Sequence, residues 1–289
     1  MEWYPTFVIS AILVVAAPFI GGILSGIDRK LTARMQNRIG PPIVQPFYDL
    51  IKLWGKESFV TSSLQVLLAF SYMAFSVIAF SLLVLAQDLL LIAFVISLAD
   101  VCLIVGSFSG RSPYGYIGGR RELLQVLSCE PIVILTFVGI YMVTKSFLVS
   151  RIFELGFPLV TVLPAIFLAL LIILPIEARK SPFDISASHH AHQEIVRGVF
   201  TEFSGPSLAL IELGHWFKLV FFLSLLTLFW APNLWLGAIL SFIFYFITMI
   251  VDNIFPRLTW KLMLKVTWIT GFTLTISNIV AVALLGGGC

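Results

Sequence analysis

The sequence predicts an all-α, polytopic membrane protein with about eight transmembrane helices. Of its 289 residues, 59% are hydrophobic and only 11% are Asp, Glu, Lys or Arg, whereas soluble domains carry about 25% charged residues. Several uninterrupted apolar runs have about 20 residues, which is the length at which a helix crosses a hydrocarbon core of about 30 Å. We find no internal repeat in these runs, and we therefore expect a single integral membrane domain over 1–289.

The apolar runs and the basic residues together predict a topology. The expected spans are 4–26, 62–86, 89–109, 121–144, 157–176, 206–230, 233–251 and 265–285. An even number of spans places both termini on one side. All Lys and Arg except Lys145, Arg151 and Lys218 lie in or beside the connections at about 27–61, 110–120, 177–205 and 252–264. The positive-inside rule makes these connections cytoplasmic. We therefore expect a multi-pass protein of the cell membrane with both termini external.

Two of these connections have distinctive compositions. In the first, Lys30, Arg34 and Arg38 recur every fourth residue, which predicts a basic stripe on a short helix before Gly40. Over 45–54, apolar residues follow the i, i+3, i+4, i+7 spacing of an interfacial amphipathic helix: Phe47, Leu50, Ile51 and Trp54. This helix is either a membrane-surface anchor or part of a docking site. The connection 110–120 is rich in glycine, so its composition predicts a mobile loop.

Acidic residues within apolar runs are the first candidates for function, because charge near hydrocarbon is costly. Asp100 lies well inside the third span, and Glu130 is followed by Pro131 and a wholly apolar run. Glu122 and Glu130 would lie about 12 Å apart along a helix and on one side of it, so they can form successive stations of an ion path. Glu122 can instead simply pair with a neighbouring arginine at the interface.

The densest group of ionisable residues lies between Glu177 and Lys218. Glu212, His215 and Lys218 have the spacing i, i+3, i+6, which suits either a structural salt-bridge cluster or a proton relay. His189, His190 and His192 lack the companions of a metal site, and this segment is either a solvated loop or a proton-accepting mouth. Cys102 and Cys129 lie in apolar runs without a CxxC pair, so we expect buried side chains and no metal.

Four segments together resemble one family. The first connection carries Asp28-Arg29-Lys30, Arg34, Gln36, Arg38, Gly40-Pro41, Gln45-Pro46, Asp49, Ile51-Lys52-Leu53 and Lys56-Glu57. The others are Arg121-Glu122 with Gln125, Ser128 and Glu130; Glu177 with Lys180 to Asp184, followed by Glu194 and Thr201 to Gly205; and Phe255-Pro256-Arg257 with Lys265. In this order and with about eight spans, they resemble the heel subunit of respiratory complex I, the membrane subunit at the junction with the peripheral arm.

The resemblance implies roles for individual residues. The acids of the polar channel would be Glu122, Glu130, Glu177, Asp184, Glu194, Glu202 and Glu212, beside Asp100, His215 and Lys218 from the arguments above. Contacts with peripheral subunits would come from Arg29, Arg34, Arg38, Asp49, Lys52 and Glu57. The implied partners are cytoplasmic iron–sulfur and hydrogenase-like large and small subunits, and antiporter-like membrane subunits. Nucleic acid is not among them. Iron–sulfur clusters, and a nickel–iron centre in a hydrogenase, would belong to the partners, with no cofactor in this chain.

The departures from the family pattern refine the expected function. Asp28 stands where complex I subunits usually carry glutamate, and 186–193 reads Ser-Ala-Ser-His-His-Ala-His-Gln in place of a run of acids. This segment is more similar to membrane subunits of energy-converting [NiFe] hydrogenases, formate hydrogenlyases and sulfur-reducing complexes. We therefore expect a non-redox anchoring and coupling subunit of such an oxidoreductase, which links electron transfer to H⁺ or Na⁺ translocation.

Three other functions remain open on the sequence alone. The chain can be the quinone-site subunit of a true complex I, with the 45–57 segment at a quinone entrance. It can be a stand-alone ion transporter, although it has no internal repeat and no clearly broken helix pair of the kind many transporters show. It can also be a passive anchor, in which the acids only neutralise buried arginines.

Overall fold

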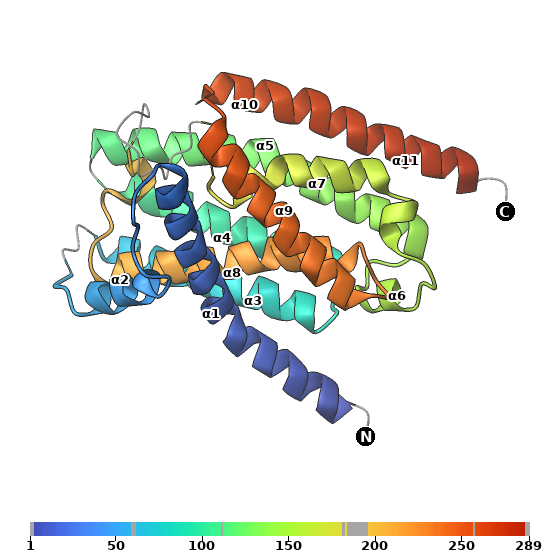
Figure 1. Ribbon diagram of the computed structural model, residues 1–289, viewed down its shortest axis with the longest axis horizontal. Coiled ribbons are helices and arrows are strands. Elements are labelled where there is room, and N and C mark those ends of the chain that lie inside the picture. Colours follow the sequence, from blue (N-terminus) through green and yellow to red (C-terminus); the bar gives the residue numbers. More distant parts are fainter. Residues whose placement is uncertain are drawn as a thin grey trace.

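The protein is a bundle of helices in the computed structural model (Figure 1). The structure describes residues 3–58, 62–110, 112–180, 183, 196–256 and 258–286, and side chains between 8 and 284. Within these ranges the long helices are α1 (Trp3–Met35), α3 (Ser63–Val84), α4 (Leu89–Ser109), α5 (Pro113–Thr144), α8 (Pro206–Leu228) and α9 (Leu234–Ile254). Shorter elements are α2 (Gln45–Trp54), α6 (Ser150–Phe153), α7 (Pro164–Glu177), α10 (Trp260–Val266) and α11 (Phe272–Gly286). A π-helical turn, Thr267–Gly271, joins α10 to α11.

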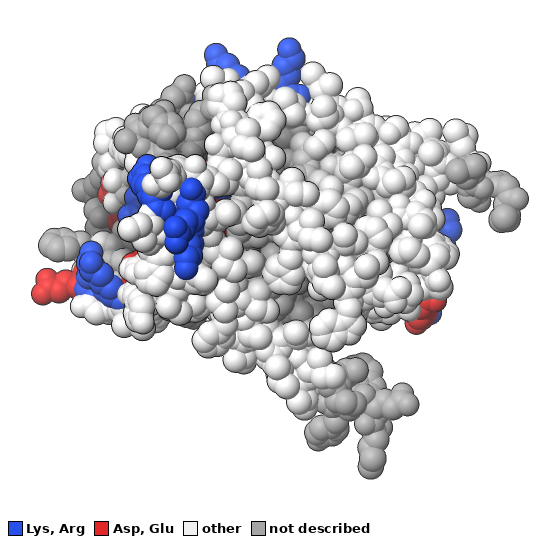
Figure 2. Space-filling model, in the orientation of Figure 1, with Lys and Arg blue, Asp and Glu red and all other residues white. Residues whose placement is uncertain are grey.

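Seven helices in the described part of the chain are long and apolar enough to cross a membrane, and the predicted all-α, multi-pass fold is confirmed. In the order of the chain they are α1, α3, α4, α5, α8, α9 and the continuous run from Trp260 to Leu284. On the face shown in Figure 2, Lys and Arg gather at the α1–α2 end and over α10, and the body between them is uncharged. Both α1 and α11 have their free ends toward the opposite end of the bundle (Figure 1).

The expected span 157–176 is wrong in length. Its helix, α7, has only 14 residues, or about 21 Å of helix, and it follows a 3₁₀ turn at Leu159–Thr161. Pro164 occupies the first helical turn, and the residue before a proline is disfavoured in the helical conformation, so the helix begins there. Asn278 of α11 caps this start: its Oδ1 accepts hydrogen bonds from the N–H groups of Ala165 and Ile166 at 3.1 Å. These N–H groups are thus paired without solvent, as a chain interruption within hydrocarbon requires.

Two of the predicted connections are also different. The basic stripe is not a separate helix, because α1 continues without a break to Met35. The glycine-rich connection 110–120 is not a loop, because α5 begins at Pro113. Its glycines serve close packing. A Cβ added at Gly118 would lie 2.2 Å from the carbonyl carbon of Gly198, and one at Gly119 would lie 2.1 Å from the Ser107 Oγ.

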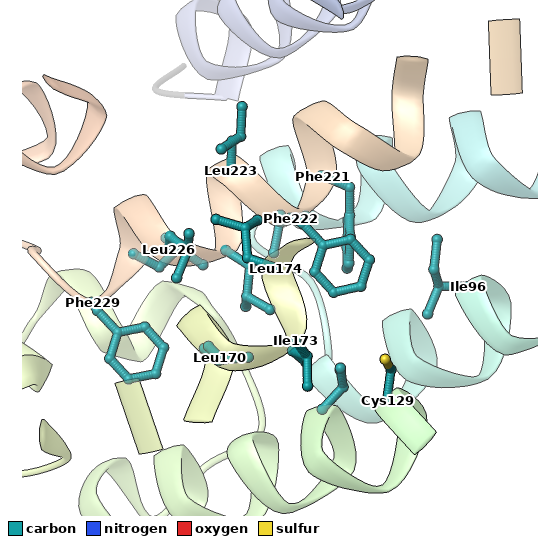
Figure 3. Close-up of a cluster of buried hydrophobic side chains, with 14 of the residues drawn as sticks. Ile96, Cys129, Leu170, Ile173, Leu174, Phe221, Phe222, Leu223, Leu226 and Phe229 are labelled. Carbon is teal, nitrogen blue, oxygen red and sulfur yellow. The ribbon is translucent and has the colours of Figure 1, made fainter. Parts of the chain in front are cut away.

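The core lies around α8, which packs against α1, α2, α3, α7 and α9. Figure 3 shows Phe221, Phe222 and Phe229 of α8 facing Leu170 and Leu174 of α7. Ile96 of α4 and Cys129 of α5 complete this cluster (Figure 3). Cys102 and Cys129 are both buried among apolar side chains, as predicted. The short helix α7 is therefore held inside the bundle, and its carboxyl-terminal residue, Glu177, is buried.

Candidate functional site

A buried charge centre joins three helices in the middle of the bundle. Lys218 of α8 places its Nζ 2.8 Å from both carboxylate oxygens of Asp100 in α4. The same Nζ is 2.8 Å from Oε2 of Glu177 at the end of α7. Each of the three side chains is at most 8% exposed. Because two carboxylates share one ammonium group, the centre has one more acidic group than basic groups.

Glu130 of α5 extends this centre towards the outside of the bundle. A cavity of about 20 Å³ is lined by Asp100, Glu130 and Glu177, with Ser97 and Ile134 among its other residues. That volume is close to the space that one water molecule needs. Glu130 is half-buried and Ile134 is 42% exposed, so the cavity lies near the outer surface of α4 and α5. A single water molecule in it can connect Glu130 to the buried pair by hydrogen bonds.

A second ion pair lies beside the first. Arg179 follows α7 directly, in the left-handed conformation with φ of 53°, and its Nη2 is 3.3 Å from the Glu122 Oε1 of α5. Its guanidinium also lies over the ring of Phe200 at 4.8 Å. Burial by itself lowers the pKa of Arg179, but the nearby acids, with Glu122 the strongest, raise it overall. The Arg179 charge is therefore fixed beside the centre.

A third pair fastens the segment after α7 to α1. Lys180 donates a short hydrogen bond to Oδ2 of Asp28. Burial lowers the pKa of Lys180, and the interactions with Tyr245 and Asp28 outweigh it, so that the pKa is raised. The departure from the family pattern at Asp28 thus keeps its carboxylate and its ion pair.

An open cavity of about 190 Å³ lies between α1, α2 and α8 at the basic end of the bundle. Its charged lining residues are Arg29, Asp49, Lys52, Lys56, Arg197 and Glu212, and its apolar ones include Leu50 and Trp216. Arg29 donates to Asp49 at 2.6 Å, and Gln45 donates to the same carboxylate at 3.0 Å. Partial burial raises the pKa of Asp49, but these hydrogen bonds and the Arg29 charge together lower it below its usual range. Asp49 is therefore held as a carboxylate in this cavity.

The residues proposed for partner docking lie at the same end. Arg29, Asp49 and Lys52 line the α2 cavity, while Arg34, Arg38 and Glu57 are exposed beside it. Helix α2 forms at the predicted residues, but its predicted apolar stripe divides. Phe47 packs against Trp216 with ring centroids 5.4 Å apart, whereas Ile51 and Trp54 are exposed.

The remaining predicted ion-path residues are more scattered than expected. Glu212 lines the α2 cavity, and Lys218 faces Asp100 and Glu177, so these two residues of α8 serve different places. His215 lies between them and is half-buried. Glu202 packs against Gly110 and Gly115, at the junction of α4 and α5. Asp184, Glu194 and the histidines at 189, 190 and 192 lie outside the described residues.

The sequence reasoning missed four polar residues that the structure brings to the charge centre or beside it. These are Tyr72, Gln125, Arg179 and Lys180. The two cations were counted only as topology signals, although their position directly after Glu177 was a clue. Tyr72 and Gln125 lie in otherwise apolar runs, where one uncharged polar side chain carries no signal of its neighbours.

Comparison with known proteins shows the family. The NADH dehydrogenase family model matches residues 7–283. This chain belongs to that family. It is similar to a membrane component of the NADH-quinone oxidoreductase of Syntrophotalea carbinolica, with 29% identity over 89% of this chain and 88% of the relative. It is also similar to hydrogenase-4 component C of Escherichia coli, with 28% identity over 87% of this chain and 88% of the relative.

The family's fold is also found in a solved structure. A chain of the membrane-bound sulfane sulfur reductase, an archaeal respiratory membrane complex, matches with a TM-score of 0.84 and 24% identity. The match covers 96% of this chain and 99% of that chain. The predicted resemblance is confirmed: within the family, this chain is a membrane subunit of the kind found in multisubunit oxidoreductases.

Proposed function

We propose that this chain is the non-redox subunit that anchors a cytoplasmic redox module and couples its electron transfer to H⁺ or Na⁺ translocation. The observation that carries the proposal is the buried centre of Asp100, Glu177 and Lys218, with Glu130 at the adjoining cavity. Three carboxylates around one ammonium group leave an excess of buried negative charge, and such charge is costly. A mobile cation relieves the cost, so the centre is suited to take up and release ions.

Coupling then follows from electrostatics. A redox module docked at the α2 cavity changes its net charge when it is reduced. Glu212 lies in this cavity and interacts with Arg179, which pairs with Glu122 near the buried centre. Each pKa unit corresponds to about 1.4 kcal/mol, so modest changes of field alter the occupancy of the buried carboxylates. Groups that interact in this way exchange protons as a set.

The basic end of the bundle supports a particular set of partners and an orientation. Its exposed Arg34 and Arg38, with the α2 cavity, suit contact with cytoplasmic iron–sulfur and hydrogenase-like subunits, which would hold the redox centres. The membrane-facing surface near Glu130 suits antiporter-like subunits. In the cell membrane, this end would face the cytoplasm and both termini would be external.

A second candidate function is the quinone-site subunit of a complex I. The α2 cavity favours it, because a 190 Å³ space with Leu50 and Trp216 among its walls can hold a flat ring. Metal analysis of the intact complex, extracted in mild detergent, separates the two. Nickel with abundant iron supports the hydrogenase type. Iron without nickel, together with quinone-dependent electron transfer, supports the quinone-site function. A chain that runs alone with neither metal contradicts both.

Removal of single acids tests the ion path. We expect Glu130→Gln and Glu212→Gln each to abolish ion translocation by the complex in liposomes while electron transfer continues, because each change removes one exchangeable charge from the path. The measurement is the ion gradient formed per electron transferred.

Glu154→Gln is the matched control. Glu154 is an exposed glutamate that pairs only locally with Arg151 at 2.6 Å, so its loss should leave the gradient unchanged. Full translocation by both Glu130→Gln and Glu212→Gln would show that the assigned path is wrong.

A further inference from the structure

Tyr72 of α3 is a polar residue between the two buried charge groups. Its side chain has no exposed surface, and its ring packs on α8 at Gly214, where an added Cβ would lie 2.7 Å from the ring. The hydroxyl makes no hydrogen bond to the described protein atoms. It interacts electrostatically with Arg179 and Glu122 on one side and with Lys218 and Asp100 on the other. The hydroxyl thus lies within reach of both ion pairs.

Other buried polar atoms nearby also lack a hydrogen bond within the described protein. They are the Gln125 Oε1 and the Arg179 Nη1. Gln125 donates from its Nε2 to the carbonyl oxygen of Ile176 at 3.1 Å, which places its amide beside Glu177. Buried polar groups are nearly always satisfied by protein or by ordered water, and buried waters usually bridge about three such groups. Bound water is therefore the natural partner of this set.

A phenol hydroxyl in such a position can pass protons. It has one O–H donor and lone pairs that accept. A proton can reach the oxygen from water on the Glu122 side while the hydroxyl's own proton leaves to water on the Asp100 side. Rotation of the hydroxyl then restores the starting state, and no covalent bond other than O–H is made or broken. A sodium ion cannot be relayed in this way.

We propose that the Tyr72 hydroxyl, with bound water at Gln125, relays protons between the Glu122–Arg179 pair and the Asp100–Lys218–Glu177 centre. The proposal rests on the proposed ion path and makes the proton the ion that is carried along it. A purely structural role does not account for the hydroxyl, because a phenylalanine would fill the same space without the cost of burying an unpaired polar group.

The test uses the intact complex in liposomes and the substitution Tyr72→Phe, which keeps the ring. We expect electron transfer to continue and proton translocation to slow about tenfold or more, with unchanged thermal stability of the complex. Translocation by the unsubstituted complex should not change when potassium replaces sodium. Tyr245→Phe is the control, because Tyr245 is also buried but lies in α9 beside Lys180 and Asp28.

The outcomes separate this inference from the proposed function. Normal translocation by Tyr72→Phe, with translocation lost in Glu130→Gln, overturns the relay and leaves the ion path intact. Normal translocation by both variants overturns the ion path and the relay together. A strict requirement for sodium overturns the proton assignment. If Tyr72→Phe fails to assemble, Gln125→Met decides: loss of translocation supports the relay, and normal translocation overturns it.

Discussion

Replacement of Lys218 by methionine is expected to destabilise the protein more than any other single change in its charged residues. The substitution leaves the carboxylates of Asp100 and Glu177 buried without their shared cation. Removal of one partner of a buried ion pair costs about 3–5 kcal/mol. We expect little assembled complex in the membrane, and we would measure the amount of this chain that purifies with its partners and the temperature at which the purified complex dissociates.

A second substitution should reverse part of this loss. The double variant Asp100→Asn with Lys218→Met removes one acid together with the cation, so it should assemble better than Lys218→Met alone but should not translocate ions. Lys145→Met is the control, because Lys145 is exposed at the end of α5. Normal assembly of Lys218→Met would contradict a charged centre, since only protonated carboxyl groups can lie there without a cation.

The substitution Gly118→Ala should have the second largest effect, although it adds only one methyl group. The new Cβ would lie 2.2 Å from the carbonyl carbon of Gly198 and 2.5 Å from the Val199 nitrogen. These are backbone atoms that cannot move aside cheaply, and overpacking of this kind costs about 1–3 kcal/mol. We expect the 198–200 segment to shift away from α5 and carry Phe200 away from the Arg179 guanidinium.

The measurements for Gly118→Ala are the dissociation temperature of the complex and the ion gradient per electron, and both should fall. Gly156→Ala provides the matched control, because a Cβ at Gly156 would meet nothing within 4 Å. If the two alanine variants behaved alike, close contact between α5 and the 198–200 segment would not be needed.

The fold was largely predictable because apolar runs of membrane length leave the chain few alternatives. The exceptions have local causes. The start of α7 depends on Asn278, which is more than 100 residues away in the sequence, so no pattern around Pro164 could reveal it. The glycines at 115–119 were interpreted as a loop because composition cannot distinguish flexible glycines from glycines that allow close packing.

The site was predictable in its residues but not in its pairs. Asp100, Glu130 and Glu177 stand out as charges in or beside apolar runs. Spacing along α8 suggested that Lys218 would join Glu212 and His215, whereas tertiary packing turns it to α4 and α7. A periodicity argument describes one helix at a time, and this centre is built from three.

The length of α7 has a consequence for how the protein can vary. Because Asn278 fixes where α7 begins and Lys218 meets the residue where it ends, the helix spans a set distance between two anchors. An added residue would turn Glu177 by about 100° and move it about 1.5 Å along the axis, away from the ammonium group. Elsewhere in a membrane protein, tilting can absorb a change of helix length. Here the distance between an amide and an ammonium group dictates the number of residues, and the bilayer does not.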